Sequence, residues 1–205
     1  GLSPIFAVEV LEPELLERVP RFNEHLDWIL ENRPELASLV SRWNEPGRGH
    51  RHLFSLLRGS RLKCLLRRML DEDEFLSPYG IRSMSKIHEK HPYVLHCEGK
   101  TKHCNGSSKV DYQPAESNTH MFGGNSNWRG PIWFPVNFLL IESLQRFHHY
   151  YGIDFKVESP SSSGQKLTLE EVAEDISTRL GDLFRRDDQG HRPIYKHHPD
   201  IQLNP

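Results

Sequence analysis

An all-α fold is the class that this sequence predicts, and three observations support the prediction. Apolar residues recur at spacings of three and four along most of the chain, as they do on one face of a helix. Loops rich in Gly, Pro, Asn and Asp separate these segments. Segments with the alternating pattern of a strand are few. Helices that alternate with loops are typical of domains in which helix packs on helix.

The sequence predicts short helices in the N-terminal part of the chain, with prolines at their starts or at breaks. Residues 12–30 carry apolar side chains on one helical face, with Pro13 in the first turn and Pro20 as a break. A further helical turn fits residues 35–40. We therefore expect one interrupted helix or two short ones in line, followed by a third turn.

Two further helices are predicted at residues 53–57 and 62–70. The second has leucines on one face and arginines and lysines on the other. It should end near Leu70, because the acidic run at 71–74 would oppose the helix dipole. Cys64 falls on the apolar side, so we expect it in the core.

The second half of the chain contains the longest irregular segment. Residues 93–124 lose the helical period and predict a long loop insertion, with short strands near residues 94–95 and 110–112. Residues 135–150 are apolar on nearly every side, which predicts a central helix buried all round. Residues 159–166 read as a Ser/Gly linker.

A capping box predicts where the last long helix begins. The Thr168 hydroxyl can accept the amide N–H of Glu171, while the Glu171 carboxylate accepts the amide N–H of Thr168. An apolar stripe at helical spacing follows it.

Composition limits the classes of partner. The chain has 205 residues, with 26 Lys and Arg against 28 Asp and Glu, for a formal charge of −2. Without a net positive field we expect no nucleic-acid partner. No apolar run is long enough to cross a bilayer, so we expect no membrane partner, and protein partners stay unknown. We find no cofactor motif and expect no cofactor.

Cysteines and histidines in the irregular segment offer three interpretations. His96, Cys97, His103 and Cys104 could supply zinc ligands, but their spacing matches no zinc pattern, so we expect no metal. A Cys97–Cys104 disulfide beside the glycosylation sequon at Asn105 would fit the secretory pathway. Free thiols in a loop are the default, which slightly favours a cytoplasmic protein.

The densest candidate for a functional site lies just before the 135–150 helix. Here glycines allow close backbone approach, amides and a guanidinium offer paired hydrogen bonds, and two indoles offer flat apolar faces. Sugars need this mixture, because their C–H faces stack on rings while their hydroxyls need planar polar partners. The alternative is that both tryptophans are core aromatics beside a glycine turn. The predicted substrate-binding residues are Asn125, Asn127, Trp128, Arg129 and Trp133.

Two other residues complete the set of candidates. Tyr79, in the turn at 77–80, could form the rim of the site or pack on its neighbours. Glu116 is the best local carboxylate for catalysis, although we favour its role as a hydrogen-bond acceptor that anchors the loop. We therefore assign no catalytic residue.

The string Asn127-Trp128-Arg129-Gly130-Pro131-Ile132-Trp133 resembles the signature of glycoside hydrolase family 63. This α-glucosidase family includes processing glucosidase I and bacterial mannosylglycerate hydrolase relatives. The segments at 75–83, 112–117 and 137–142 also resemble that family, and the similarity extends from about Phe6 to Tyr195.

The resemblance implies a fold and an activity. The fold would be a partial (α/α)6 toroid of the six-hairpin glycosidase type, with residues 1–205 a fragment of one catalytic domain. The activity would be inverting hydrolysis of α-glucosidic bonds in oligosaccharides, for which this segment supplies the sugar-binding loop and an inner-barrel helix. In the family both catalytic carboxylates lie outside the matched region, so we expect this chain alone to be inactive. The alternative is a non-catalytic carbohydrate-binding or helical scaffold protein.

Overall fold

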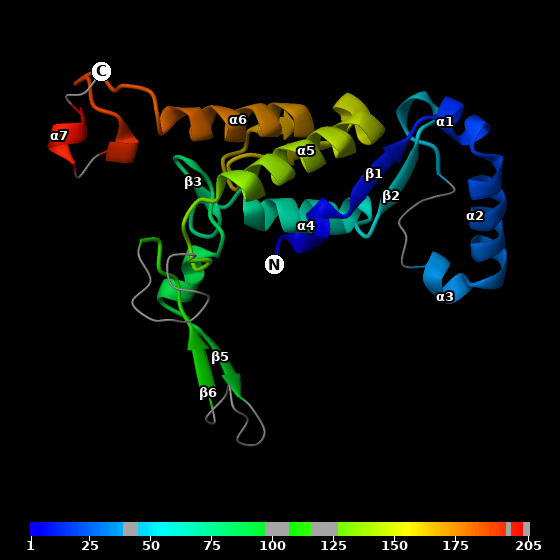
Figure 1. Cartoon of the computed structure of the whole chain (residues 1–205), viewed down its shortest axis with the longest axis horizontal. Helices are drawn as coiled ribbons and strands as arrows, with labels where there is room; N and C mark the ends of the chain where they lie inside the picture. Colours follow the sequence, from blue (N-terminus) through cyan, green and yellow to red (C-terminus); the bar gives the residue numbers. More distant parts are fainter. Residues whose placement is uncertain (39–44, 97–106, 116–126, 196–197, 203–205) are drawn as a thin grey trace. The chain divides into compact units, whose positions relative to one another are not determined.

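Helices and four two-stranded antiparallel sheets form the fold in the computed structural model (Figure 1). The structure describes residues 1–38, 45–96, 107–115, 127–195 and 198–202. The predicted all-α class is wrong, and with it the partial (α/α)6 toroid, because the described chain combines helices with small sheets. Each strand has only two to four residues. Strands this short show little alternation, and the sequence indicated only those near residues 94–95 and 110–112.

The fold divides into two units. The first contains residues 1–67 and 138–175, and the second contains residues 68–137 and 176–205.

In the first unit, a sheet joins segments that are far apart in the sequence. Strand β1 (Val8–Leu11) pairs antiparallel with β2 (His52–Ser55), and Val8 lies opposite Ser55 (Figure 1). The helix predicted at residues 53–57 is therefore wrong. Leu53 and Ser55 are buried and Phe54 is not, which is the alternation of a strand whose pairing supplies the missing hydrogen bonds.

Three short helices lie between these two strands in the sequence. They are α1 (Pro13–Arg18), α2 (Pro20–Asn32) and α3 (Pro34–Ala37). Each begins with a proline, whose missing N–H costs nothing in a first turn. The predicted break at Pro20 is confirmed, because α1 ends at Arg18 and α2 begins at Pro20.

Helix α4 (Gly59–Met69) ends one residue before the predicted position at Leu70. Its Leu62 and Leu66 are fully buried. The expectation for Cys64 is wrong, because that side chain is exposed. Successive residues of a helix are rotated by about 100° around its axis, so a residue at the edge of an apolar stripe can face water.

Helix α5 (Phe134–Tyr151) is buried on one side only, so the predicted burial all round is wrong. Leu140, Leu144 and Phe147 are inaccessible to solvent, whereas Phe138 is 60% exposed and Leu139 is 49% exposed. The spacing of the buried positions is that of a surface helix. Apolar composition alone could not distinguish these two cases.

A hairpin and a capped helix follow α5 in the sequence. Strand β7 (Lys156–Glu158) pairs with β8 (Lys166–Thr168), and the residues expected to form a Ser/Gly linker are the connection between them. Helix α6 (Leu169–Asp182) then begins with the predicted capping box, which is confirmed. The Thr168 N–H donates to Glu171 Oε2 at 2.7 Å, and the Glu171 N–H donates to Thr168 Oγ1 at 3.3 Å.

The second unit contains two further hairpins and a short terminal helix. Strand β3 (Leu76–Ser77) pairs with β4 (Gly80–Ile81). Strand β5 (Tyr93–His96) pairs with β6 (Ser107–Val110) (Figure 1). Helix α7 (Pro199–Gln202) follows near the C-terminus. No described helix is both long and apolar enough to span a membrane.

Asn137 joins the first turn of α5 to β4. Its side chain is fully buried, and its Oδ1 accepts the Ile81 N–H at 2.7 Å. Its Nδ2 donates to the carbonyl oxygens of Ile81 at 2.9 Å and Trp133 at 3.0 Å. One amide therefore satisfies the backbone of β4 and fixes the start of the helix that follows the tryptophan motif.

We predict that Asn137→Ala lowers the free energy of unfolding by about 2 kcal/mol, because it leaves buried backbone groups without partners. Asn32→Ala is the matched control: its Nδ2 donates to the Trp28 carbonyl at 2.9 Å but is exposed, so the loss should stay within about 0.5 kcal/mol. Urea unfolding of both variants measures the difference. Equal losses would show that the Asn137 bonds are not a special support.

Candidate functional site

The side chain of Arg129 points into the second unit and not toward solvent. It is 2% exposed, and its Nη1 lies 3.3 Å from Asp111 Oδ1. Its Nη2 donates to Gln113 Oε1 at 2.5 Å, and the Gln113 N–H donates to the Arg129 carbonyl, also at 2.5 Å. The guanidinium therefore connects the motif to the segment just after β6.

Asn127 is also turned inward. Its Nδ2 donates to the carbonyl oxygens of Gln113 and Ala115, each at 2.6 Å. Its Oδ1 accepts the Arg129 N–H at 3.0 Å. Both side chains bind protein groups. The contacts with sugar hydroxyls that we expect from Asn127 and Arg129 stay predictions.

Trp128 lies between these two buried residues in the sequence but is itself exposed. Its side chain is 47% exposed, and its ring stacks on Trp133 with centroids 4.2 Å apart and planes 9° apart. The Trp133 Nε1–H donates to the Asn127 carbonyl at 3.0 Å. The stack thus has an outer indole open to solvent and an inner indole held by a hydrogen bond.

Gly130 permits the close approach that completes this arrangement. It has φ of +138°, where side chains are rarely accommodated, and its N–H donates to Ser83 Oγ at 3.0 Å. A Cβ at this position would lie 2.5 Å from the Tyr112 ring. The Ser83 N–H in turn donates to the Pro131 carbonyl at 3.1 Å. Three segments of the second unit therefore meet at this glycine.

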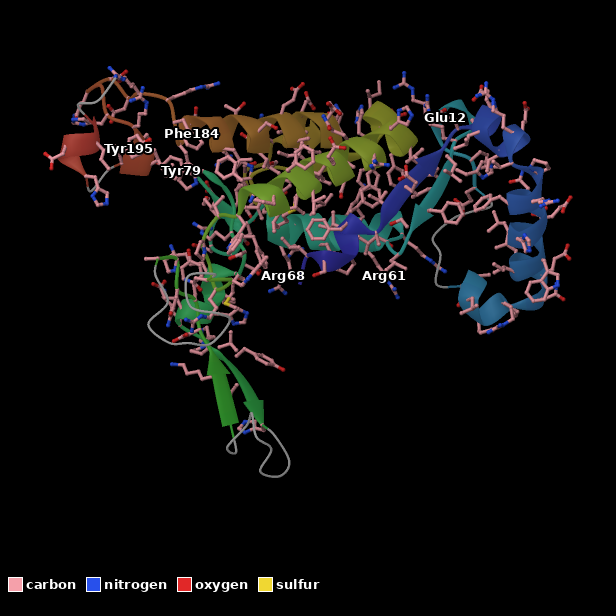
Figure 2. The ribbon with its side chains drawn as sticks, in the orientation of Figure 1. Glu12, Arg61, Arg68, Tyr79, Phe184 and Tyr195 are labelled. Carbon is pink, nitrogen blue, oxygen red and sulfur yellow. The ribbon has the colours of Figure 1, made fainter. Side chains whose placement is uncertain are left out.

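The other predicted residues are placed less fully. Tyr79 lies in the β3–β4 turn, where its N–H donates to Ser77 Oγ at 3.1 Å (Figure 2). Among the described residues, no hydrogen bond joins Tyr79 to the 127–133 segment. Asn125 and Glu116 lie outside the described residues, as do Cys97, Cys104 and Asn105.

Sequence reasoning missed a polar pocket in the first unit. It has a volume of about 440 Å³ and contains four carboxylates. Its lining residues are Glu9, Val10 and Glu12 from β1 and the residue after it, Glu142, Gln145, Arg146, His148 and His149 from α5, and Glu170 from α6. The polar residues of α5 share one helical face, and this pattern could have indicated a polar site. The sequence did not indicate that β1 lies against that face.

Glu12 is the most connected carboxylate of this pocket, and Figure 2 shows it beside the beginning of α1. Its Oε1 lies 2.5 Å from His149 Nε2 and 2.8 Å from Arg51 Nε. The hydrogen bond from His149, and after it that from Arg51, lowers the pKa of the Glu12 carboxyl below its usual 4.5. Arg146 pairs with Glu9 beside it.

These side chains are joined to one another and not arranged around a cation. Within the described part of the chain, no group of three or more His, Cys, Asp or Glu residues has the geometry to hold a metal ion. The pocket is therefore a network of ion pairs that ties β1 to α5.

Comparison with known proteins supports a distant relationship to a glycosidase. No protein-family model matches the chain. The chain is 49% identical over 196 residues to the uncharacterized protein YMR196W of Saccharomyces cerevisiae. The matched region covers 95% of this chain and 18% of that protein. The chain is also 29% identical over 128 residues to a probable mannosyl-oligosaccharide glucosidase of Schizosaccharomyces pombe. This second match covers 57% of this chain and 12% of that protein. The chain thus spans less than a fifth of the length of either relative.

We predict that Gly130→Ala destabilises the chain by about 2 to 3 kcal/mol, because the methyl group adds a clash with Tyr112 to the strain of positive φ. Gly164→Ala is the control. Gly164 also has positive φ, at +79°, but nothing lies within 4 Å of the added Cβ, so only the backbone strain of about 1 kcal/mol should remain. Thermal unfolding of the two variants separates the clash from the strain.

The lowered pKa of Glu12 predicts a pH dependence. A carboxyl whose pKa is lower in the folded state stabilises that state above its unfolded pKa of 4.5, and this stabilisation is lost as the pH falls through the folded value. Glu12→Gln should therefore reduce the fall in urea midpoint between about pH 5 and about pH 3. The control Glu14→Gln alters an exposed carboxylate on α1. Identical pH profiles for Glu12→Gln and the parent chain would contradict the prediction.

Proposed function

We propose that this chain is the sugar-binding segment of a glycoside hydrolase that acts on α-glucosidic bonds of oligosaccharides. The observation that carries the proposal is the Trp128–Trp133 stack, whose outer ring is open to solvent and whose inner ring is fixed. The axial C–H groups of a glucose ring would lie on the exposed indole face of Trp128. Trp133 would support the indole of Trp128 on its other face.

The way in which the stack is supported favours ligand binding over core packing. A large aromatic side chain in a core buries most of its surface, whereas Trp128 leaves nearly half of its surface open. The residues on both sides of it are buried and hydrogen-bonded. A rigid, exposed ring binds a flat ligand at low entropic cost, because little motion is lost on binding.

Similarity to a probable mannosyl-oligosaccharide glucosidase supports the choice of substrate class. The formal charge of −2 suits a neutral ligand better than a phosphate polymer. Tyr79 and Asn125 remain candidates for further contacts with the sugar.

The reaction we propose for the whole enzyme is inverting hydrolysis. A carboxylic acid protonates the leaving oxygen while a second carboxylate activates water. We assign neither role within this chain: Asp111 is paired with Arg129, and Glu116 lies outside the described residues. The chain would bind sugar without hydrolysing it.

A non-catalytic carbohydrate-binding protein is the second candidate. It is favoured by the same stack, which needs no catalytic carboxylate to bind a sugar. Release of glucose from maltotriose by the purified chain would identify an enzyme, and binding without release would fit either a separate binding protein or a segment of a larger enzyme.

We predict that Trp128→Ala weakens maltotriose binding at least about tenfold, because the stacking surface is removed, whereas Trp128→Phe retains part of the affinity. Trp28→Ala is the matched control, since Trp28 is 55% exposed on α2 and lies outside the motif. Isothermal titration calorimetry measures all three variants. Absence of binding by the parent chain, or unchanged binding by Trp128→Ala, would overturn the proposed function.

A further inference from the structure

We infer that Asp111 and Gln113 are positioning residues, which hold Trp128 in its binding orientation without touching the sugar. The inference rests on the proposed function for its ligand and on the hydrogen-bond network for its geometry. Neither residue stands out in sequence as a sugar contact. Both lie in the short segment that follows β6.

The first step is the burial of the guanidinium. Arg129 is always charged, and its side chain is only 2% exposed. A buried cation is stable only if its charge and its N–H groups have partners. Asp111 supplies the charge at 3.3 Å and Gln113 supplies an acceptor at 2.5 Å. Gln113 Nε2 also donates to Asp111 Oδ1 at 3.2 Å, which fixes the two acceptors relative to each other.

The second step connects this pair to the tryptophans through backbone. The Gln113 N–H and carbonyl bind the Arg129 carbonyl and the Asn127 side chain. Both neighbours of Trp128 are therefore held by the same residue. The Asn127 carbonyl then accepts the Trp133 indole N–H, which fixes the inner ring on which Trp128 stacks.

The direction of the effect follows from the cost of an unpaired charge. Without Asp111, the Arg129 guanidinium would gain by moving toward water. Trp128 is the adjacent residue, so its backbone would turn with Arg129 and the stack would open. A neutral Asn at position 111 keeps an acceptor oxygen in place but removes the charge, so it should retain only part of the geometry.

The indole N–H of Trp133 offers a test that does not depend on sugar. The chain has four tryptophans, so a ¹H–¹⁵N spectrum shows four indole signals, which single Trp→Phe variants assign. We expect Asp111→Ala to speed hydrogen exchange of the Trp133 indole at least about tenfold and to weaken maltotriose binding by a similar factor. Asp111→Asn should restore both properties to within about threefold of the parent chain.

Lys109→Ala is the matched control. Lys109 Nζ lies 3.8 Å from the other carboxylate oxygen of Asp111, but its side chain is 60% exposed, so removing it should change neither property. Should Asp111→Ala fail to fold, as judged by circular dichroism, Gln113→Ala carries the test, because it keeps the ion pair and removes the second acceptor. It too should speed the Trp133 exchange.

The two readouts separate this inference from the proposed function. Faster Trp133 exchange in Asp111→Ala supports the positioning role even if no variant, nor the parent chain, binds maltotriose. Unchanged exchange and unchanged binding in both Asp111→Ala and Gln113→Ala, beside a loss of binding in Trp128→Ala, would overturn the positioning role but not the proposed sugar binding by the Trp128–Trp133 stack. Equal losses in Asp111→Asn and Asp111→Ala would support the positioning role and assign it to the charge of Asp111, because both variants leave the buried guanidinium without an anion.

Discussion

The buried guanidinium of Arg129 is the constraint on which the arrangement of the tryptophan motif depends. A cation withdrawn from water must meet an anion and several acceptors, and these come from Asp111 and Gln113. Satisfying them brings the segment after β6 against the motif. Asn127 then bridges the same segment from the other side of Trp128. The polar requirements of two buried side chains thus decide where the exposed indole points.

The buried and the exposed residues of the 127–133 motif have different roles. Its hydrogen-bonding residues are mainly internal supports, and its exposed chemistry is the flat face of one indole. Gly130 contributes by allowing the Tyr112 ring to approach, and Asn137 contributes by fixing the first turn of α5 to β4. The supporting side chains Asn127, Arg129 and Asn137 are held by hydrogen bonds within the protein, which restricts their motion.

Features that depend on neighbouring residues were predicted correctly, and features that depend on distant contacts were not. The capping box at Thr168, the break at Pro20 and the end of α4 depend on neighbouring residues, and the structure confirms them. The β1–β2 pair joins residues more than forty positions apart, so nothing in the local pattern at residues 53–57 revealed a strand. The burial of α5 failed for a related reason, because the faces of an apolar helix are distinguished only by what packs on them.

The sequence by itself predicted the residues of the candidate site: two indoles, a guanidinium, amides and glycines in one short segment. It also determined the local stops and starts of several helices, because capping and proline effects act within a few residues. Only the tertiary structure decided that Trp128 faces solvent while Asn127 and Arg129 face inward, and that Glu12 meets Arg51 and His149. The physical reason is that burial and ion pairing depend on partners far away in the chain, whose approach no local pattern specifies.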